Sequence, residues 1–318
     1  MNYNYIPKIQ ELLERPLKDL TCMTDDVELQ GEFLEIPMRV NRTREVIEAV
    51  VCPTKKSDIQ LVISTQQGCN VRCWFCDMGD LNSNIQGNNL TPNEMLEELT
   101  IALQQGMSQG YDFDLDSLKI TFAKGGEPLM NPNLLEILEI IKVRLGVKIK
   151  ISTTFPACNL SRHIFDGLLD FAEDYPNTIQ PQISLLSTDE NRRREITSIN
   201  PISFSELRKK AEGWHCRVKN ARKFLLSFTL DVNTPCVPEA INTILPPEYF
   251  AVRLRRWIPT INGKQYGLKR PILSKIRDLE NRFRDYGYMI IPGESTATEV
   301  ENGLTAGYNH RRMPDSDY

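Results

Sequence analysis

From residue 58 onward, short runs of apolar residues alternate with longer segments whose apolar residues recur every three or four positions. The short runs are typical of buried strands, and the periodic segments are typical of helices that bury one face. Strands are predicted at residues 58–65, 117–123, 147–153, 179–186, 223–230 and 250–258. Helices are predicted at residues 91–106, 131–145, 160–173, 203–214, 238–245 and 271–286. This order predicts a parallel sheet, open or closed as a barrel, with ligands at the carboxyl ends of its strands.

Two of the predicted helices begin with clear capping signals. Thr91 precedes the first, with Pro92 in the first turn and Glu94 three residues after the cap. Ser203 and Glu206 have the same spacing at the start of a later helix. A hydroxyl and a glutamate at this spacing can satisfy two free backbone N–H groups, so helices are expected to begin just after Thr91 and Ser203.

Residues 1–57 follow a different pattern. A predicted helix at residues 6–14 precedes two strand-like runs at residues 31–40 and 44–53. These runs predict a small β addition beside the main fold, and no linker separates independent domains. The expected divisions are an N-terminal extension at 1–57, a main α/β unit at 58–292 and a C-terminal segment at 293–318.

Composition narrows the class of protein. Of the 318 residues, 41% are hydrophobic and 25% are charged, as in folded globular proteins. The sequence lacks an apolar run long enough to span a membrane and the apolar core of a signal peptide, so a cytoplasmic protein with no membrane partner is expected. The net charge of −4 disfavours a broad basic face that grips a long RNA. In a cytoplasmic protein, the eight cysteines are expected to be thiols or metal ligands rather than disulfides.

Three of those cysteines are closely spaced directly after the first strand of the main unit. Cys69, Cys73 and Cys76 form a C-x3-C-x2-C pattern within STQQGCNVRCWFCDMG. A structural zinc ion requires four ligands, and the fourth would have to come from a distant residue such as Cys158 or Cys52. A 4Fe-4S cluster held by three thiolates is the better explanation, because its fourth iron is then open to bind and reduce a ligand.

A second motif follows one strand–helix unit later. KGGEP (124–128) closes the second predicted strand. Together with the three cysteines, it resembles the signature of radical S-adenosylmethionine (SAM) enzymes. This resemblance implies a partial (β/α)6 barrel, a 4Fe-4S cluster on the three cysteines and SAM bound to the open iron. It also implies reductive cleavage of SAM to a 5′-deoxyadenosyl radical that abstracts hydrogen, with the electron supplied by an external donor of the flavodoxin or ferredoxin type.

Further segments narrow the resemblance. STQQGC, NNLTPNEM, QISLLSTDENRRREITSIN and the IP of RRWIPTINGKQYG are similar, in order, to the RlmN/Cfr family over residues 40–307. That family methylates an adenine ring carbon in RNA. Leu186 stands where the family has a histidine, and the family's downstream asparagine falls near Ile261 or Asn262. On this resemblance, the residues expected to bind SAM are Gly125, Gly126, Glu127, Ser152, Ser184, Leu185, Leu186 and Asn262.

The chain departs from that family at both cysteines of the methyl relay. The resemblance places the methyl-carrying cysteine at Asn302 and the resolving cysteine at Val62. The sequence has no cysteine after Cys236. An amide and an isopropyl group cannot act as thiolate nucleophiles, so methylation through a thiol relay is not expected.

Glu48 occupies the position of the family's proton acceptor and is the candidate general base. The alternative is a strand glutamate that pairs with a nearby arginine such as Arg44.

Polar residues are also expected inside the barrel. Because side chains alternate along a strand, Lys150 shares the face of Ser152, and Gln182 lies on the inward face of the fourth strand. The resemblance places Arg256 at an inward position on the sixth strand. Buried cations need anionic partners, so these residues, together with Asn302, are expected to bind a substrate bearing phosphate or carboxylate. Ion pairs with carboxylates of the protein itself are the alternative.

These observations predict an enzyme that cleaves SAM reductively and abstracts hydrogen directly from a small, anionic, nucleotide- or carboxylate-bearing substrate. RNA is the less favoured partner. One alternative is an RlmN/Cfr-like RNA adenosine C-methyltransferase that uses another methyl carrier. A second alternative is a non-enzymatic RNA-binding module stabilised by zinc.

Overall fold

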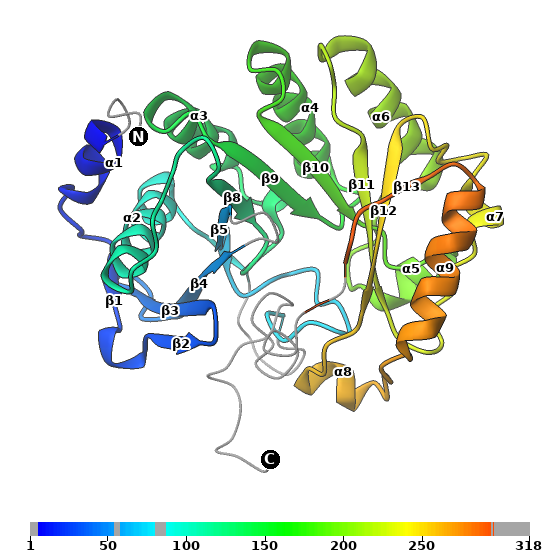
Figure 1. The fold of residues 1–318 in the computed structure, drawn as a ribbon, viewed down its shortest axis with the longest axis horizontal. Helices are drawn as coiled ribbons and strands as arrows, with labels where there is room; N and C mark the ends of the chain where they lie inside the picture. Colours follow the sequence, from blue (N-terminus) through cyan, green and yellow to red (C-terminus); the bar gives the residue numbers. More distant parts are fainter. Residues whose placement is uncertain (1–5, 54–57, 80–86, 294, 296–318) are drawn as a thin grey trace.

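The computed structural model describes residues 6–53, 58–79, 87–293 and 295 of the chain. Its main feature is one curved sheet, in which neighbouring strands follow the order β1-β3-β4-β5-β8-β9-β10-β11-β12-β13 and β2 pairs with β3. Figure 1 shows helices α2, α3, α4, α6 and α9 on the outer side of this sheet. The fold is therefore a mixed α/β fold built around a parallel sheet, as predicted.

The parallel part of the sheet runs from β5 to β13. Its strands are β5 (Ile59–Ile63), β8 (Lys119–Phe122), β9 (Lys148–Thr153), β10 (Ile179–Ser184), β11 (Phe224–Leu230), β12 (Phe250–Arg256) and β13 (Met289–Ile290). The long helices are α2 (Pro92–Ser108), α3 (Leu134–Arg144), α4 (Asn159–Asp174), α6 (Phe204–Arg217) and α9 (Leu273–Asp285). Shorter helices are η2 (Pro128–Met130), α5 (Glu190–Ile196), α7 (Pro238–Ile241) and α8 (Ile261–Gln265). Among the described residues, no helix combines the length and the apolar character needed to cross a membrane.

Each strand and helix predicted from residue 58 onward overlaps an observed element of the same type. The elements α5, α8 and β13 are missing from the prediction, as are the two-residue strands β6 (Gln66–Gln67) and β7 (Asn88–Asn89). The two-residue strands are too short for a hydrophobic period to show. Both predicted caps are present. The hydroxyl of Thr91 accepts from the backbone N of Glu94 (3.1 Å), and the Glu94 carboxylate accepts from the backbone N of Thr91 (2.8 Å). Ser203 caps α6 by accepting from the backbone N of Glu206 at 3.2 Å.

The N-terminal strands continue the main sheet instead of standing beside it. This part of the chain contains α1 (Ile6–Leu13), β1 (Leu20–Cys22), η1 (Thr24–Asp26), β2 (Glu28–Gln30), β3 (Phe33–Val40) and β4 (Val46–Pro53). Strand β4 pairs antiparallel with β5, with Val50 opposite Val62 and Cys52 opposite Gln60. The sheet therefore crosses the boundary expected near residue 57, and strands β3 and β4 extend the wall of the barrel.

Two buried carboxylates of α2 fasten neighbouring segments to that helix. Glu97 accepts hydrogen bonds from three successive backbone N–H groups at residues 18–20, at 2.8 to 2.9 Å. Glu98 accepts from the backbone N of Ser64 at 2.9 Å. Burial raises the pKa of Glu98 well above its ordinary value, although the hydrogen bond from Ser64 opposes this. Glu98 thereby fixes the chain just after β5, where the segment with the three cysteines begins.

Candidate active site

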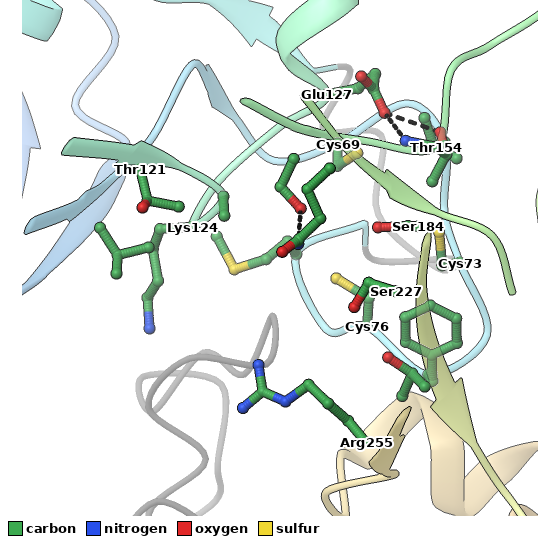
Figure 2. A pocket seen from close by; sticks show the side chains of 18 of the residues that line it. Cys69, Cys73, Cys76, Thr121, Lys124, Glu127, Thr154, Ser184, Ser227 and Arg255 are labelled. Carbon is green, nitrogen blue, oxygen red and sulfur yellow. Dashed lines mark hydrogen bonds between the residues drawn. The ribbon is translucent and has the colours of Figure 1, made fainter. Parts of the chain in front are cut away.

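One pocket is lined by side chains from β5, β8, β9, β10, β11 and β12 and by the loop that follows β6 (Gln66–Gln67). It holds about 1160 Å³ of empty space, part of it open to solvent. Figure 2 shows Ser184, Ser227 and Arg255 around this space together with the cysteines. Parallel strands that converge on one polar pocket are the usual setting for a ligand site in α/β folds.

The three cysteines of the C-x3-C-x2-C pattern line this pocket together, as Figure 2 shows. Their loop begins at Gly68, whose φ of 73° favours glycine, and turns again at Arg72, whose φ is 49°. A hydrogen bond from the backbone N of Cys76 to the backbone O of Cys73 (3.0 Å) closes its second half. The structure thus brings Cys69, Cys73 and Cys76, the predicted cluster ligands, to one site.

The electrostatics of the three thiols fit an iron–sulfur cluster. Burial raises the pKa of each thiol, to about 11 for Cys76, and the neighbouring Cys76 and Cys69 raise the pKa of Cys73 further. Three thiolates so placed therefore need a positive centre to keep them ionised. Among the described residues, no three His, Cys, Asp or Glu side chains are placed to hold a single metal ion. Three thiolates at one pocket are the ligand set that a 4Fe-4S cluster with one open iron would take.

The far end of the cysteine loop is fastened to α8. The Asp77 carboxylate accepts from the backbone N of Ile261 (3.0 Å) and from that of Asn262 (2.8 Å). The Asn262 side chain donates to the backbone O of Cys76 at 2.9 Å. Asn262 was predicted to contact SAM, but it is buried against this loop and does not line the pocket. Its observed contacts position the loop.

The Gly-Gly-Glu-Pro turn lies next to the cysteine loop. Gly126 and Glu127 line the pocket, whereas Gly125 packs against Gln66 and Ser64 behind it. The Glu127 carboxylate accepts hydrogen bonds from the hydroxyl of Thr153, from the backbone N and the hydroxyl of Thr154 (both 2.8 Å) and from the backbone N of Leu129 (3.1 Å). Burial raises the pKa of Glu127, and these hydrogen bonds oppose the shift. The side chain of Glu127 therefore ties the end of β8 to the end of β9.

Gly126→Ala is expected to destabilise the fold more than Gly146→Ala. A Cβ on Gly126 would lie 2.5 Å from the Cβ of Gln66 and 2.7 Å from its backbone N. Gly146 also has a positive φ (71°, against 91° for Gly126), but a Cβ there would have no atom within 4 Å. Backbone strain of ~1–2 kcal/mol is common to both variants, and overpacking adds ~1–3 kcal/mol at Gly126 alone. Urea unfolding measures the difference, and equal losses of stability would contradict the predicted clash.

The two serines predicted to bind SAM both line the pocket, and the two leucines do not. Ser152 lies on β9 and Ser184 at the end of β10. Gln182 also lines the pocket, where its Nε2 donates to the Ser152 hydroxyl at 2.7 Å. Leu185 and Leu186 are buried, with exposed fractions of 0% and 1%, and their side chains lie outside the pocket lining. Any contact of this pair with SAM would therefore come from the backbone.

The residues predicted to bind the substrate are only some of the polar and cationic residues that line the pocket. Lys150, Gln182 and Arg256 all line the pocket, as expected. Arg253 and Arg255 line it too, and the sequence reasoning missed them. The signal that could have found them is the alternation of apolar and charged residues in FAVRLRR, the sequence of β12. Its apolar side chains are buried, so the arginines between them face the pocket. Asn302 lies outside the described residues.

Glu48 is buried on β4, and the alternative pairing with Arg44 is not what the structure shows. Its carboxylate forms an ion pair with Lys124 (3.2 Å), which also pairs with Glu35 on β3 at 3.2 Å. Lys124 lines the pocket, whereas Glu48 does not. Any role of Glu48 as a base would therefore involve the lysine in front of it.

A family model for the radical SAM superfamily matches residues 63–212. The matched part contains the three cysteines and the Gly-Gly-Glu-Pro turn, which share one pocket in the structure. The chain is a radical SAM enzyme. The cofactors of this superfamily, a 4Fe-4S cluster and SAM, supply reductive cleavage of SAM and a carbon radical able to abstract hydrogen.

Curated relatives of this radical SAM enzyme are RNA methyltransferases. The dual-specificity RNA methyltransferase RlmN of Solidesulfovibrio magneticus is 34% identical over 128 residues, which cover 38% of this chain and 34% of that protein. The probable dual-specificity RNA methyltransferase RlmN of Clostridium botulinum is 27% identical over 261 residues, 80% of this chain and 69% of that protein. The ribosomal RNA large subunit methyltransferase Cfr of Lachnoclostridium phytofermentans is 31% identical over 159 residues, 48% of this chain and 40% of that protein. The first and third matches thus span less than half of those relatives.

A solved structure shares the fold of this radical SAM enzyme. The crystal structure of a radical SAM methyltransferase from Sphaerobacter thermophilus matches 94% of this chain and 83% of that one, with a TM-score of 0.73 and 21% identity. At this identity the likeness concerns the fold alone, and it confirms the predicted α/β barrel class.

Proposed function

We propose that this radical SAM enzyme modifies an RNA base in the manner of the RlmN/Cfr methyltransferases. The observation that carries the proposal is the similarity to the Clostridium botulinum RlmN over 261 residues, well beyond the superfamily match at residues 63–212. This similarity favours RNA over the small anionic metabolite that the sequence patterns favoured. The electron is supplied by an external donor of the flavodoxin or ferredoxin type.

In this proposal, each part of the pocket has its own task. The cluster ligands are Cys69, Cys73 and Cys76. The SAM-binding residues are Gly126, Glu127, Ser152 and Ser184. Asp77 binds the start of α8, and Asn262 binds the backbone of Cys76. These contacts fix the position of the cysteine loop. Buried apolar side chains around the strand ends exclude water, which protects a reactive radical from side reactions.

A second candidate is direct hydrogen abstraction from a small anionic substrate, and Val62 favours it. Val62 lines the pocket at the position where the family resemblance places a resolving cysteine. A valine there cannot form the disulfide that releases a thiol-bound product. RNA methylation by this chain would therefore need a methyl carrier other than the thiol relay, whereas direct abstraction needs none.

A single assay distinguishes the two candidates. The enzyme is purified anaerobically, reduced, and supplied with SAM and either RNA or adenine mononucleotides deuterated on the base and ribose. Methylated adenine in RNA supports the proposed function. Deuterium that moves from a mononucleotide into 5′-deoxyadenosine, with RNA unchanged, supports the second candidate. A chain free of iron and inorganic sulfide would contradict both.

A further inference from the structure

Two aromatic rings and a guanidinium are stacked beside the cysteine loop, and we call this group the aromatic rim: Trp74, Tyr266 and Arg192. The rings of Trp74 and Tyr266 are almost parallel, with an interplanar angle of 6° and centroids 4.7 Å apart. The Arg192 guanidinium lies over the Trp74 ring, 4.8 Å from its centroid. Trp74 stands between Cys73 and Cys76 in the sequence, so the stack begins at the proposed cluster site.

The aromatic rim is built from three segments that hydrogen bonds hold together. The backbone N of Trp74 donates to the backbone O of Ile196, at the end of α5, at 3.0 Å. The hydroxyl of Thr260 donates to the backbone O of Phe75 at 3.1 Å, and Thr260 is the first cap of α8, which ends at Tyr266. Groups that are already held in place lose little conformational entropy when a ligand binds to them. The rim is therefore preorganised for binding.

The aromatic rim lies beside the main pocket. Trp74 and Arg192 line a smaller cavity that shares three lining residues with the main pocket: Phe75, Thr229 and Trp257. Because α8 follows β12, Tyr266 lies at the carboxyl ends of the strands, as the cysteine loop does (Figure 1). A substrate larger than the pocket, such as RNA, rests its remaining parts on the surface around the entrance.

One side of the stack is open to solvent. Tyr266 is 41% exposed although Trp74 covers one face of its ring, so the opposite face is accessible. Two exposed lysines flank this ring, Lys264 on α8 and Lys269 shortly after it. The segment 260–277 has five Lys or Arg and no Asp or Glu, whereas the whole chain has a net charge of −4. The rim therefore presents a flat ring within a locally basic surface.

We propose that the aromatic rim stacks against an unpaired base of the RNA substrate, beside the nucleotide whose base enters the main pocket. This inference rests on the proposed function. Single-stranded RNA is bound by stacking its bases on aromatic rings and on Arg guanidinium planes. A base on the open face of Tyr266 continues the parallel stack that Tyr266 and Trp74 already form. Arg192 forms an ion pair with Glu195 (2.9 Å), so its contribution is the flat guanidinium more than its charge.

The lysines suit the backbone of the same RNA. Each phosphodiester has one negative charge, and one exposed ammonium, of Lys264 or Lys269, matches it. An acidic electron-transfer protein would also be attracted to these lysines. The parallel rings favour RNA, because a planar base extends such a stack over its whole face.

Fluorescence anisotropy of a labelled single-stranded RNA, bound to the full, anaerobically reconstituted enzyme, tests the aromatic rim. The comparison strand has the same length and charge but carries abasic nucleotides. The wild type is expected to bind RNA at least ~10-fold more tightly than the abasic strand, and Tyr266→Leu is expected to lower the affinity for RNA ~10-fold, which is the effect of losing one stacked base. The affinity of Tyr266→Leu for the abasic strand should equal that of the wild type. Tyr266→Phe keeps the ring and should bind RNA like the wild type.

Tyr286→Leu is the matched control, and salt dependence separates stacking from charge. Tyr286 follows α9 as Tyr266 follows α8, but it stands just before β13, at the amino ends of the parallel strands. Its replacement should leave RNA affinity unchanged. Lys269→Gln should lower the slope of log affinity against log salt by ~0.7, the value for one phosphate of a single strand. Tyr266→Leu should leave that slope unchanged, because stacking releases no counterions.

The proposal is overturned if Tyr266→Leu binds RNA as tightly as the wild type. It is also overturned if the wild type binds RNA and the abasic strand equally, a comparison that needs no variant to fold. Slower reduction of the cluster by flavodoxin in Tyr266→Leu, at unchanged RNA affinity, would assign the rim to the electron donor instead.

Methylation of RNA by the wild type is assayed separately. Base-dependent binding through Tyr266 without methylation contradicts the proposed function alone. Methylation together with unchanged RNA binding by Tyr266→Leu contradicts the role of the aromatic rim alone.

Discussion

Cys73→Ser is expected to remove the iron–sulfur absorption of the anaerobically purified enzyme and to slow reductive cleavage of SAM by at least ~10³-fold, which corresponds to ~4 kcal/mol in the activation barrier. Cys73 is the most buried of the three pocket cysteines, at 8% exposure, and burial, followed by its neighbours Cys76 and Cys69, raises its pKa. Iron–sulfur clusters are held by soft thiolate ligands, which serine cannot replace. Iron and sulfide analysis, visible absorption and formation of 5′-deoxyadenosine measure the effect.

Cys216→Ser is the matched control for this substitution. Cys216 is exposed on α6 and lies outside the pocket lining. The same chemical change there should leave iron content and SAM cleavage at wild-type levels. Circular dichroism of both variants separates loss of the cluster from loss of the fold. Full iron content and SAM cleavage in a folded Cys73→Ser variant would overturn the assignment of this thiol as a ligand.

The order of elements along the main unit could be predicted because local patterns determine it. The capping box at Thr91 and Glu94 and the apolar runs of the strands depend on residues close in sequence. The path of the N-terminal strands could not be predicted in the same way. The pairing of Val50 with Val62 depends on the register between strands, which tertiary packing determines. The sequence therefore showed the strands of the extension but not that they continue the barrel wall.

The candidate site also combines features that local sequence determines with features that only tertiary packing determines. The cysteines and the Gly-Gly-Glu-Pro turn are local motifs, and the structure places both at one pocket. Arg253 and Arg255 could have been found from strand alternation, which was applied to Lys150 but not to β12. The contacts of Asn262 with the cysteine loop could not be read from sequence, because they join residues 76–77 to residues 261–262.

The Lys124 cluster is the clearest case of information that only the three-dimensional fold contains. Lys124 follows β8, whereas its two partners Glu35 and Glu48 come from β3 and β4. Nothing in the local sequence around Lys124 indicates carboxylates that lie 76 and 89 residues away. The sequence places this lysine in the KGGEP turn, and the structure shows that it also joins the N-terminal strands to the wall of the pocket.

Lys124→Met is expected to lower the free energy of unfolding by ~3–5 kcal/mol, because it leaves Glu35 and Glu48 buried without their shared cation. All three side chains are at most 5% exposed. Burial alone would lower the pKa of Lys124, but Glu48 and Glu35 raise it above its ordinary value. The ammonium therefore stays charged through the neutral range, so its pairing with the two carboxylates should persist there in the wild type. Urea unfolding at several pH values measures the loss of stability.

Lys119→Met is the matched control, since it removes the same side chain at the opposite end of the same strand. Lys119 begins β8 and pairs with Asp58 at 2.5 Å, but its side chain is 32% exposed. A partly solvated pair of this kind contributes at most ~1 kcal/mol. Adding Glu35→Gln to Lys124→Met should recover part of the lost stability, because one of the two carboxylates that lost the lysine is then replaced by a neutral amide. If Lys124→Met costs no more than Lys119→Met, or if Glu35→Gln makes the double variant weaker still, the cluster does not stabilise the fold through charge pairing. The N-terminal strands would then be held to the pocket by the pairing of β4 with β5 and by apolar packing around Val50 and Val62.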